Sequence, residues 1–167
     1  IFIFGLPRSG STLLSQLVAK NLQIGFVNSI IAKFWQAPLV GISLSKYLQR
    51  SKTDNNYVSD RGKSESIWGP HEFAYFWHYW LNKKELKDFT RFDHINPKEG
   101  ISWGKLALKV LQMQERFDSG MVFKTAYAAN HIRKFNKHFD FPFFIHIERD
   151  QIDVGLSILK SRISYYN

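Results

Sequence analysis

A glycine-containing segment near the beginning of the sequence has the residue types that bind phosphate. Residues 5–12 read Gly-Leu-Pro-Arg-Ser-Gly-Ser-Thr. The two glycines have the spacing of the phosphate loop Gly-x-x-x-x-Gly-Lys-Ser/Thr, in which backbone N–H groups converge on phosphate oxygens at a helix N-terminus. Ser11 replaces the lysine that reaches the β- and γ-phosphates, which argues against hydrolysis of a nucleoside triphosphate. Arg8 still places a cation inside the loop, so we predict a cradle for a smaller anion.

A second candidate anion site lies near the end of the sequence. Arg149 follows the apolar run 143–147, and Ser157 comes eight residues later. An arginine at the carboxyl end of a strand lies where open α/β sheets bind ligands, and its planar guanidinium suits a phosphate. Ser157 adds a hydroxyl donor. From these residues alone, an ion pair of Arg149 with Asp150 or Asp153, with Ser157 facing solvent, is the competing interpretation.

Together the two segments resemble sulfotransferases that use 3′-phosphoadenosine 5′-phosphosulfate (PAPS). Residues 7–12, Pro-Arg-Ser-Gly-Ser-Thr, are similar to the 5′-phosphosulfate loop of that family, and Arg149 and Ser157 have the spacing of its 3′-phosphate site. Gln151 departs from the family, which often has proline there. The resemblance implies transfer of a sulfuryl group from PAPS to a hydroxyl or amine acceptor, with no metal required. The residues it assigns to nucleotide binding are Pro7, Arg8, Ser9, Gly10, Ser11, Thr12, Arg149 and Ser157.

Such a transfer needs a cation at the leaving oxygen and a base for the acceptor's proton. Arg8 stays charged at any ordinary pH, so it suits the first role. Pro70 is placed to start a helix, which predicts His71 and Glu72 in the first helical turn. The helix dipole would keep Glu72 ionised there, whereas an imidazole exchanges protons near neutral pH. We favour Glu72 as the base and keep His71 as the alternative, since relatives use either residue type.

Short apolar runs and helical periodicity predict the elements that position these residues. Three runs read as buried strands, at 1–4, 121–123 and 143–147. Helical stripes lie around residues 13–18, 73–81, 103–111, 132–135 and 152–163. Strands that alternate with helices predict an α/β three-layer sandwich with a central parallel sheet, opened by a strand–loop–helix like that of P-loop NTPases. The polar segment 43–66 is expected to be a long loop or flap.

The aromatic run 73–80 presents two faces in a helical arrangement. The residues of one stripe are expected to pack on the sheet: Phe73, Phe76, Trp77 and Trp80. Aromatic side chains with polar tips lie off that stripe and are suited to stacking on the rings of an acceptor. The candidates for such an acceptor cleft are Tyr75, His78 and Tyr79, with Trp35 and Trp68 as weaker ones.

Composition and length limit the remaining possibilities. The 167 residues, 44% of them hydrophobic, fit one sulfotransferase-like domain covering residues 1–167, and we expect it to be a piece of a longer chain. The chain has no cysteine, and Tyr75 interrupts a His-Glu-x-x-His zinc motif, so we expect no metal site. No run approaches the roughly 20 apolar residues of a membrane helix. We expect a cytoplasmic protein, or a Golgi-lumenal one if the parent chain carries an anchor.

The formal charge of +9 favours an anionic partner without identifying it. We expect PAPS and its product PAP as ligands, a small-molecule, lipid or glycan acceptor, and no nucleic acid. Two alternatives stay open. A P-loop phosphotransferase or nucleotide kinase is weakly supported by Glu148 and Asp150. A non-catalytic polyanion-binding domain fits the charge, but the basic clusters 83–84 and 133–134 are short.

Overall fold

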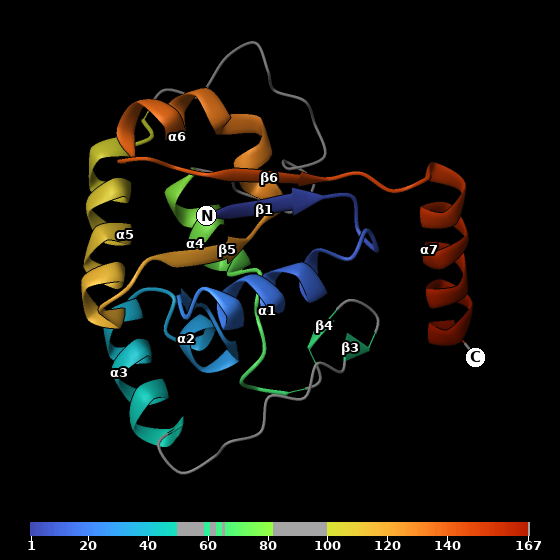
Figure 1. Ribbon diagram of the computed structural model, residues 1–167, viewed down its shortest axis with the longest axis horizontal. Helices are drawn as coiled ribbons and strands as arrows, with labels where there is room; N and C mark the ends of the chain where they lie inside the picture. The colour runs from blue at the N-terminus through green and yellow to red at the C-terminus, as the bar shows by residue number, and fades with distance from the viewer. Residues whose placement is uncertain (50–58, 61–62, 65, 82–99, 167) are drawn as a thin grey trace.

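Four parallel strands form the central sheet of the computed structural model, which describes residues 1–49, 59–60, 63–64, 66–81 and 100–166 (Figure 1). In spatial order they are β2 (Gly25–Phe26), β5 (Met121–Lys124), β1 (Phe2–Gly5) and β6 (Phe144–Ile147). The parallel pairing sets Phe2 opposite Phe123 on one side and Phe144 on the other. The predicted parallel sheet and its three apolar strands are confirmed. The two-residue strand β2 was not predicted.

Helices surround this sheet, and each of the five predicted stripes overlaps one of them, although the stripe 73–81 extends one residue beyond α4 at each end. Their bounds are α1 (Ser11–Asn21), α2 (Ser29–Lys33), α3 (Pro38–Gln49), α4 (Ala74–Trp80), α5 (Trp103–Phe117), α6 (Ile132–His138) and α7 (Gln151–Tyr166). A 3-10 helix, η2 (Ala126–His131), follows β5, and β3 (Ser59–Asp60) pairs with β4 (Lys63–Ser64) in a separate antiparallel sheet. In the part of the chain that the structure describes, no helix combines the length and apolar character needed to span a membrane.

The sheet separates two apolar clusters because successive strand residues point to opposite faces. On one face Phe2 lies at the centre, with its ring 5.5 Å from that of Phe123, 4.8 Å from Phe135 and 6.2 Å from Trp77. On the other face Ile3 and Val122 pack against α1. The larger cluster includes residues of α2, α3, α4, α5 and α6, so helices cover both faces and the predicted three-layer arrangement is confirmed.

The prediction of a loop over 43–66 is wrong for its first part. Helix α3 continues through residues 43–49, with Ile42 fully buried and Pro38 at its first turn, a position that proline favours. Its apolar face packs against α2 and α5, and this tertiary burial outweighs the polar composition. Residues 59–60 and 63–64 pair as β3 and β4. Residues 50–58, 61–62 and 65 lie outside the described residues.

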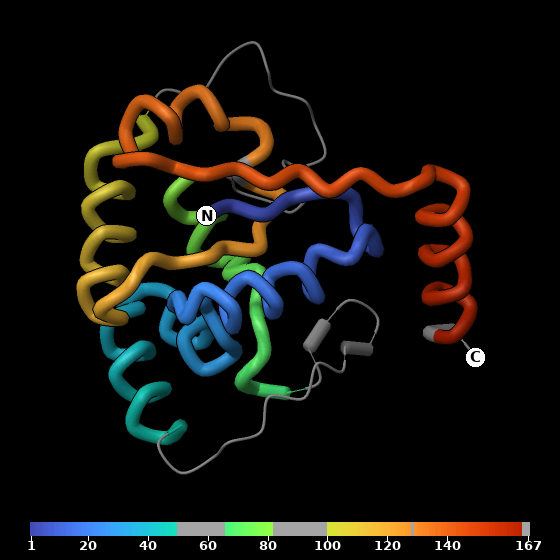
Figure 2. Tube along the Cα trace, in the orientation of Figure 1, coloured from blue at the N-terminus to red at the C-terminus, as the bar shows by residue number. Residues whose placement is uncertain are grey.

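Helix α7 differs from the other helices in its surroundings. It stands apart from them at the end of an extended segment that follows β6 (Figures 1 and 2). Val154 is its one buried hydrophobic residue among the described side chains. Four larger apolar residues of this helix are exposed: Ile152, Leu156, Leu159 and Ile163.

Candidate active site

The phosphate-loop segment connects the end of β1 to the beginning of α1, as predicted. Arg8 and Gly10 both have positive φ, 71° and 98°, so the backbone turns twice through the left-handed region before the helix starts. Gly10 is the residue that allows the second turn at no steric cost. At Gly5 a Cβ atom would lie 2.7 Å from the carbonyl oxygen of Ile147, so only glycine permits this close approach to β6. The resulting loop is the kind of backbone concavity that binds anions.

Two hydroxyl side chains of the loop are buried. Ser9 and Thr12 are 9% and 5% exposed. Among the described residues, the Ser9 Oγ atom has no hydrogen-bond partner. Since a buried hydroxyl without a partner carries a desolvation penalty, a bound anion would satisfy it. A phosphate group therefore fits the donor set of this loop.

Lys124 extends from the carboxyl end of β5 to this loop. Its Nζ atom donates a hydrogen bond to Thr12 Oγ1 over 3.0 Å and forms an ion pair with Glu72 Oε1 over 3.1 Å. The side chain of Lys124 is only 9% exposed. One buried cation thus links the phosphate loop to the predicted base. Sequence reasoning missed Lys124, although its place after a central strand is the same signal that singled out Arg149.

The segment that carries Glu72 is not helical, which corrects the prediction that Pro70 starts the helix. Helix α4 begins at Ala74, because Phe73 has a φ of 56° and breaks the helical path before it. Pro70 instead forms an antiparallel bridge with Asn28, and the His71 N–H donates to the carbonyl oxygen of Val27 over 2.7 Å. Backbone pairing therefore positions the segment that carries Glu72. Glu72 is not in the first turn of α4, where the helix dipole was expected to act on its carboxylate.

His71 and Glu72 differ in what their side chains contact. The Nδ1 atom of His71 accepts a hydrogen bond from the Phe73 N–H over 3.0 Å, so one ring nitrogen stabilises the turn before α4. Glu72 contacts Lys124, and its side chain is 55% exposed. The structure therefore brings Glu72, and not the Nδ1 atom of His71, into contact with the cation beside the phosphate loop.

Tyr127 adds a phenol close to Glu72 that sequence reasoning did not identify. Burial, followed by the negative charge of Glu72, raises the pKa of Tyr127 above its ordinary value of 10.0. Its ring also packs edge-on against His78, with centroids 5.6 Å apart. A phenol with a raised pKa keeps its proton and can donate a hydrogen bond. No local sequence pattern marks Tyr127, because its proximity to Glu72 depends on the fold.

The two anion-binding motifs of the sequence meet in space. The Nε atom of Arg8 donates to Ser157 Oγ over 3.0 Å, and Arg149 Nη1 donates to the backbone carbonyl of Arg8 over 3.1 Å. Arg149 Nη2 also lies 3.8 Å from Asp153 Oδ2, so the competing ion pair is present as well. Asp150 accepts backbone N–H groups in the first turn of α7 through its Oδ1 atom. Arg149 and Ser157 are thus placed beside the loop that contains Arg8.

Within the described residues, no group of three or more histidine, aspartate or glutamate side chains could hold a metal ion.

Comparisons with known proteins identify the family. No curated protein and no solved structure matches the chain. Residues 1–166, essentially the whole chain, match the sulfotransferase family. With its α/β fold, its parallel sheet and its phosphate-type loop, the chain belongs to the sulfotransferase family.

Proposed function

We propose that the chain transfers a sulfuryl group from PAPS to a hydroxyl or amine acceptor. In this reaction the bond between sulfur and the bridging phosphate oxygen breaks, a bond from sulfur to the acceptor atom forms, and the acceptor loses a proton. The observation that carries the proposal is the contact series Thr12, Lys124 and Glu72. It joins an anion-binding loop, a cation and a carboxylate, which are the three groups that the transfer needs.

The nucleotide would bind between the loop 7–12 and the beginning of α7. Backbone N–H groups and the hydroxyls of the loop suit the 5′-phosphate, because they lie at the N-terminus of α1. The buried Ser9 hydroxyl would gain a partner there. Arg149 and Ser157 suit the 3′-phosphate, since one supplies a guanidinium and the other a hydroxyl next to Arg8.

Arg8 and Lys124 would stabilise the negative charge that develops on the leaving phosphate oxygen. Both side chains carry a positive charge and lie at the loop, Arg8 within it and Lys124 bonded to Thr12. The nearly complete burial of Lys124 lowers the local dielectric, which strengthens its interaction with an anion. Ser11 occupies the position of the P-loop lysine, and Lys124 would supply the missing cation from β5.

Glu72 would accept the proton of the acceptor. Its carboxylate lies at the edge of the site, exposed enough for an acceptor to approach and in contact with Lys124. Tyr127 nearby can orient an acceptor oxygen by donating a hydrogen bond. His71 remains the second candidate, although its Nδ1 atom already accepts the Phe73 N–H.

The test is transfer itself, measured with PAPS and a panel of oligosaccharides, phenols and amines. We expect PAP to form together with a sulfated acceptor, and the amounts of both products to fall strongly in Glu72→Gln and Lys124→Met. Lys20→Met, which removes an exposed lysine of α1, is the matched control and should keep the wild-type rate. Phosphorylated products with magnesium ATP, and none with PAPS, would replace the proposal with a phosphotransferase.

A further inference from the structure

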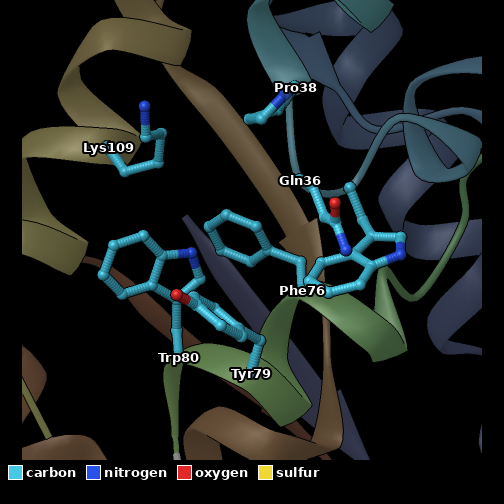
Figure 3. Close-up of a pocket in the computed structure, with 7 residues that line it drawn as sticks. Gln36, Pro38, Phe76, Tyr79, Trp80 and Lys109 are labelled. Atoms are coloured by element: carbon cyan, nitrogen blue, oxygen red, sulfur yellow. The ribbon is translucent and has the colours of Figure 1, made fainter.

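A pocket lined mainly by aromatic residues lies beside α4 (Figure 3). Its volume is about 360 Å³, within the range of small-molecule sites. The lining comes from α4, from α5 and from the connection between α2 and α3. The lining residues are Trp35, Gln36, Pro38, Phe76, Tyr79, Trp80 and Lys109.

The aromatic walls of this pocket offer ring faces to a ligand. Tyr79 is 66% exposed, and its ring centroid lies 5.7 Å from that of Trp35 and 5.5 Å from that of Trp80. The faces of such rings carry partial negative charge, whereas the C–H groups on the face of a sugar ring carry partial positive charge. The walls therefore suit a pyranose ring at least as well as a flat aromatic ligand.

The polar groups of the pocket point to a negative charge on that ligand. Lys109 Nζ donates to the neutral Gln112 Oε1 atom over 3.0 Å, and no carboxylate of the described residues forms an ion pair with it. Gln36 is exposed, and its amide forms no hydrogen bond within the described part of the chain. A purely apolar lipid or steroid would offer no hydrogen-bond partner to the Lys109 ammonium or to the Gln36 amide. A carboxylate and neighbouring hydroxyls would pair with both.

The pocket and Glu72 lie near opposite ends of the same helix, α4. Tyr79 and Trp80 lie on α4, five and six residues after its first residue, Ala74, and Glu72 immediately precedes the Phe73 turn. At 1.5 Å per helical residue, the rise along α4 from Ala74 to Tyr79 and Trp80 is about 7.5 to 9 Å. A chain of linked sugars can span such a distance with one unit in the pocket and another at the base.

We propose that the pocket binds an acidic sugar unit of a glycan acceptor, with the sugar ring against Tyr79 and Trp35 and its carboxylate at Lys109. The link to catalysis rests on the proposed function. The binding itself is independent of sulfuryl transfer, so it can be measured without PAPS.

The test is calorimetric titration with a tetrasaccharide of alternating glucuronate and N-acetylglucosamine, compared with the same tetrasaccharide after reduction of its carboxyl groups to alcohols. The wild-type protein should bind the acidic form about tenfold more tightly, the usual effect of a charge-assisted hydrogen bond. Lys109→Gln should bind both forms equally, and Tyr79→Ala should weaken both about tenfold. Lys134→Gln, which removes an exposed lysine of α6, should retain the wild-type preference.

Binding of PAP to the same variants separates this inference from the proposed function. PAP should bind Lys109→Gln and Tyr79→Ala with wild-type affinity, which also shows that both variants fold. If PAP binds but the acidic tetrasaccharide does not, or if Lys109→Gln keeps the preference for the acidic form, the inference is overturned while the proposed function stands. If the tetrasaccharide binds through Lys109 but PAP does not bind, the proposed function fails and the sugar site stands.

Discussion

Two groups of charged and hydroxyl side chains meet at the phosphate loop, and they differ in how the fold holds them. The transfer group, Thr12, Lys124 and Glu72, is joined by Lys124, which ends the central strand β5 and has a side chain only 9% exposed. The nucleotide group, Arg8, Arg149 and Ser157, depends on α7, and the Arg149 side chain is 46% exposed. Lys124 can act strongly on charge in a transition state, because little water screens its buried ammonium. Arg149 is open to solvent, so a ligand can reach its guanidinium directly.

This difference predicts that substitutions in the transfer group change the rate and substitutions in the nucleotide group change affinity. Arg8 belongs to both groups of the proposal, because its guanidinium donates to Ser157 while its position in the loop would place it at the 5′ end of a bound nucleotide. Substitution of each residue in turn tests this division.

Glu72→Gln should give the largest effect, because the amide cannot take the acceptor's proton. We expect the rate of PAP formation from PAPS to fall by about 100-fold or more, with little change in PAP affinity. His71→Gln is the paired variant, and its rate should stay within about threefold of wild type because the amide oxygen can still accept the Phe73 N–H. A larger loss in His71→Gln than in Glu72→Gln would transfer the role of base to His71.

Lys124→Met should lower the rate by about 100-fold, since one preorganised charge at the leaving oxygen is lost while the unbranched side chain still fills the space. Steady-state kinetics of PAP formation measure the effect, with Lys20→Met as the control. A wild-type rate in Lys124→Met would show that the buried cation has only a structural role. A loss of PAP affinity in Lys124→Met, with no change in the rate of PAP formation, would place Lys124 in the nucleotide group.

Arg149→Ala should weaken PAP binding about tenfold and leave AMP binding unchanged, because only PAP has the 3′-phosphate. The expected tenfold loss of affinity corresponds to one charge-assisted hydrogen bond, weakened because the Arg149 side chain is partly exposed to water. Isothermal calorimetry with both nucleotides measures it. Arg133→Ala, at an exposed arginine of α6, should leave both affinities unchanged. Equal weakening of PAP and AMP by Arg149→Ala would remove Arg149 from the 3′-phosphate site.

Ser157→Ala should weaken PAP binding by only about threefold, since a neutral hydroxyl contributes less than a guanidinium. The same calorimetric titrations measure this smaller change. If Ser157→Ala instead lowers the rate as strongly as Lys124→Met, the division between the two groups of residues is wrong.

Removal of the Glu72 charge should also lower the pKa of Tyr127 towards its ordinary value. Burial is the larger cause of the raised pKa, so Glu72→Gln should remove only part of the shift. A pH titration of the Tyr127 ring signals by NMR, in wild type and in Glu72→Gln, measures the difference. An unchanged Tyr127 pKa in Glu72→Gln would place the phenol away from the base.

Local patterns in the sequence were sufficient to predict most of the fold. The apolar strand runs and the helical stripes depend on neighbouring residues, so they could be recognised without the structure. The loop 5–12 was recognisable for the same reason, since its glycine spacing and flanking elements are contiguous. Helices α2 and α3 were missed, although Asn28 as a cap and Pro38 in a first turn are signals for them.

The transfer group could not be assembled from the sequence because its contacts join distant residues. Lys124 and Thr12 are 112 positions apart, and a single lysine after a short strand resembles many surface lysines. The position of Glu72 was also misread, since the positive φ of Phe73 that excludes it from α4 is rare for a bulky side chain. Pairing of Pro70 with Asn28 holds the segment, and no periodicity marks that bridge.

Calorimetric binding of PAP, AMP and magnesium ATP tests the proposed PAPS site most directly, since it requires no knowledge of the acceptor. We expect PAP to bind clearly more tightly than AMP and magnesium ATP, and the preference for PAP over AMP to disappear in Arg149→Ala. Binding of magnesium ATP as tight as that of PAP, or tighter, would contradict the proposed PAPS site.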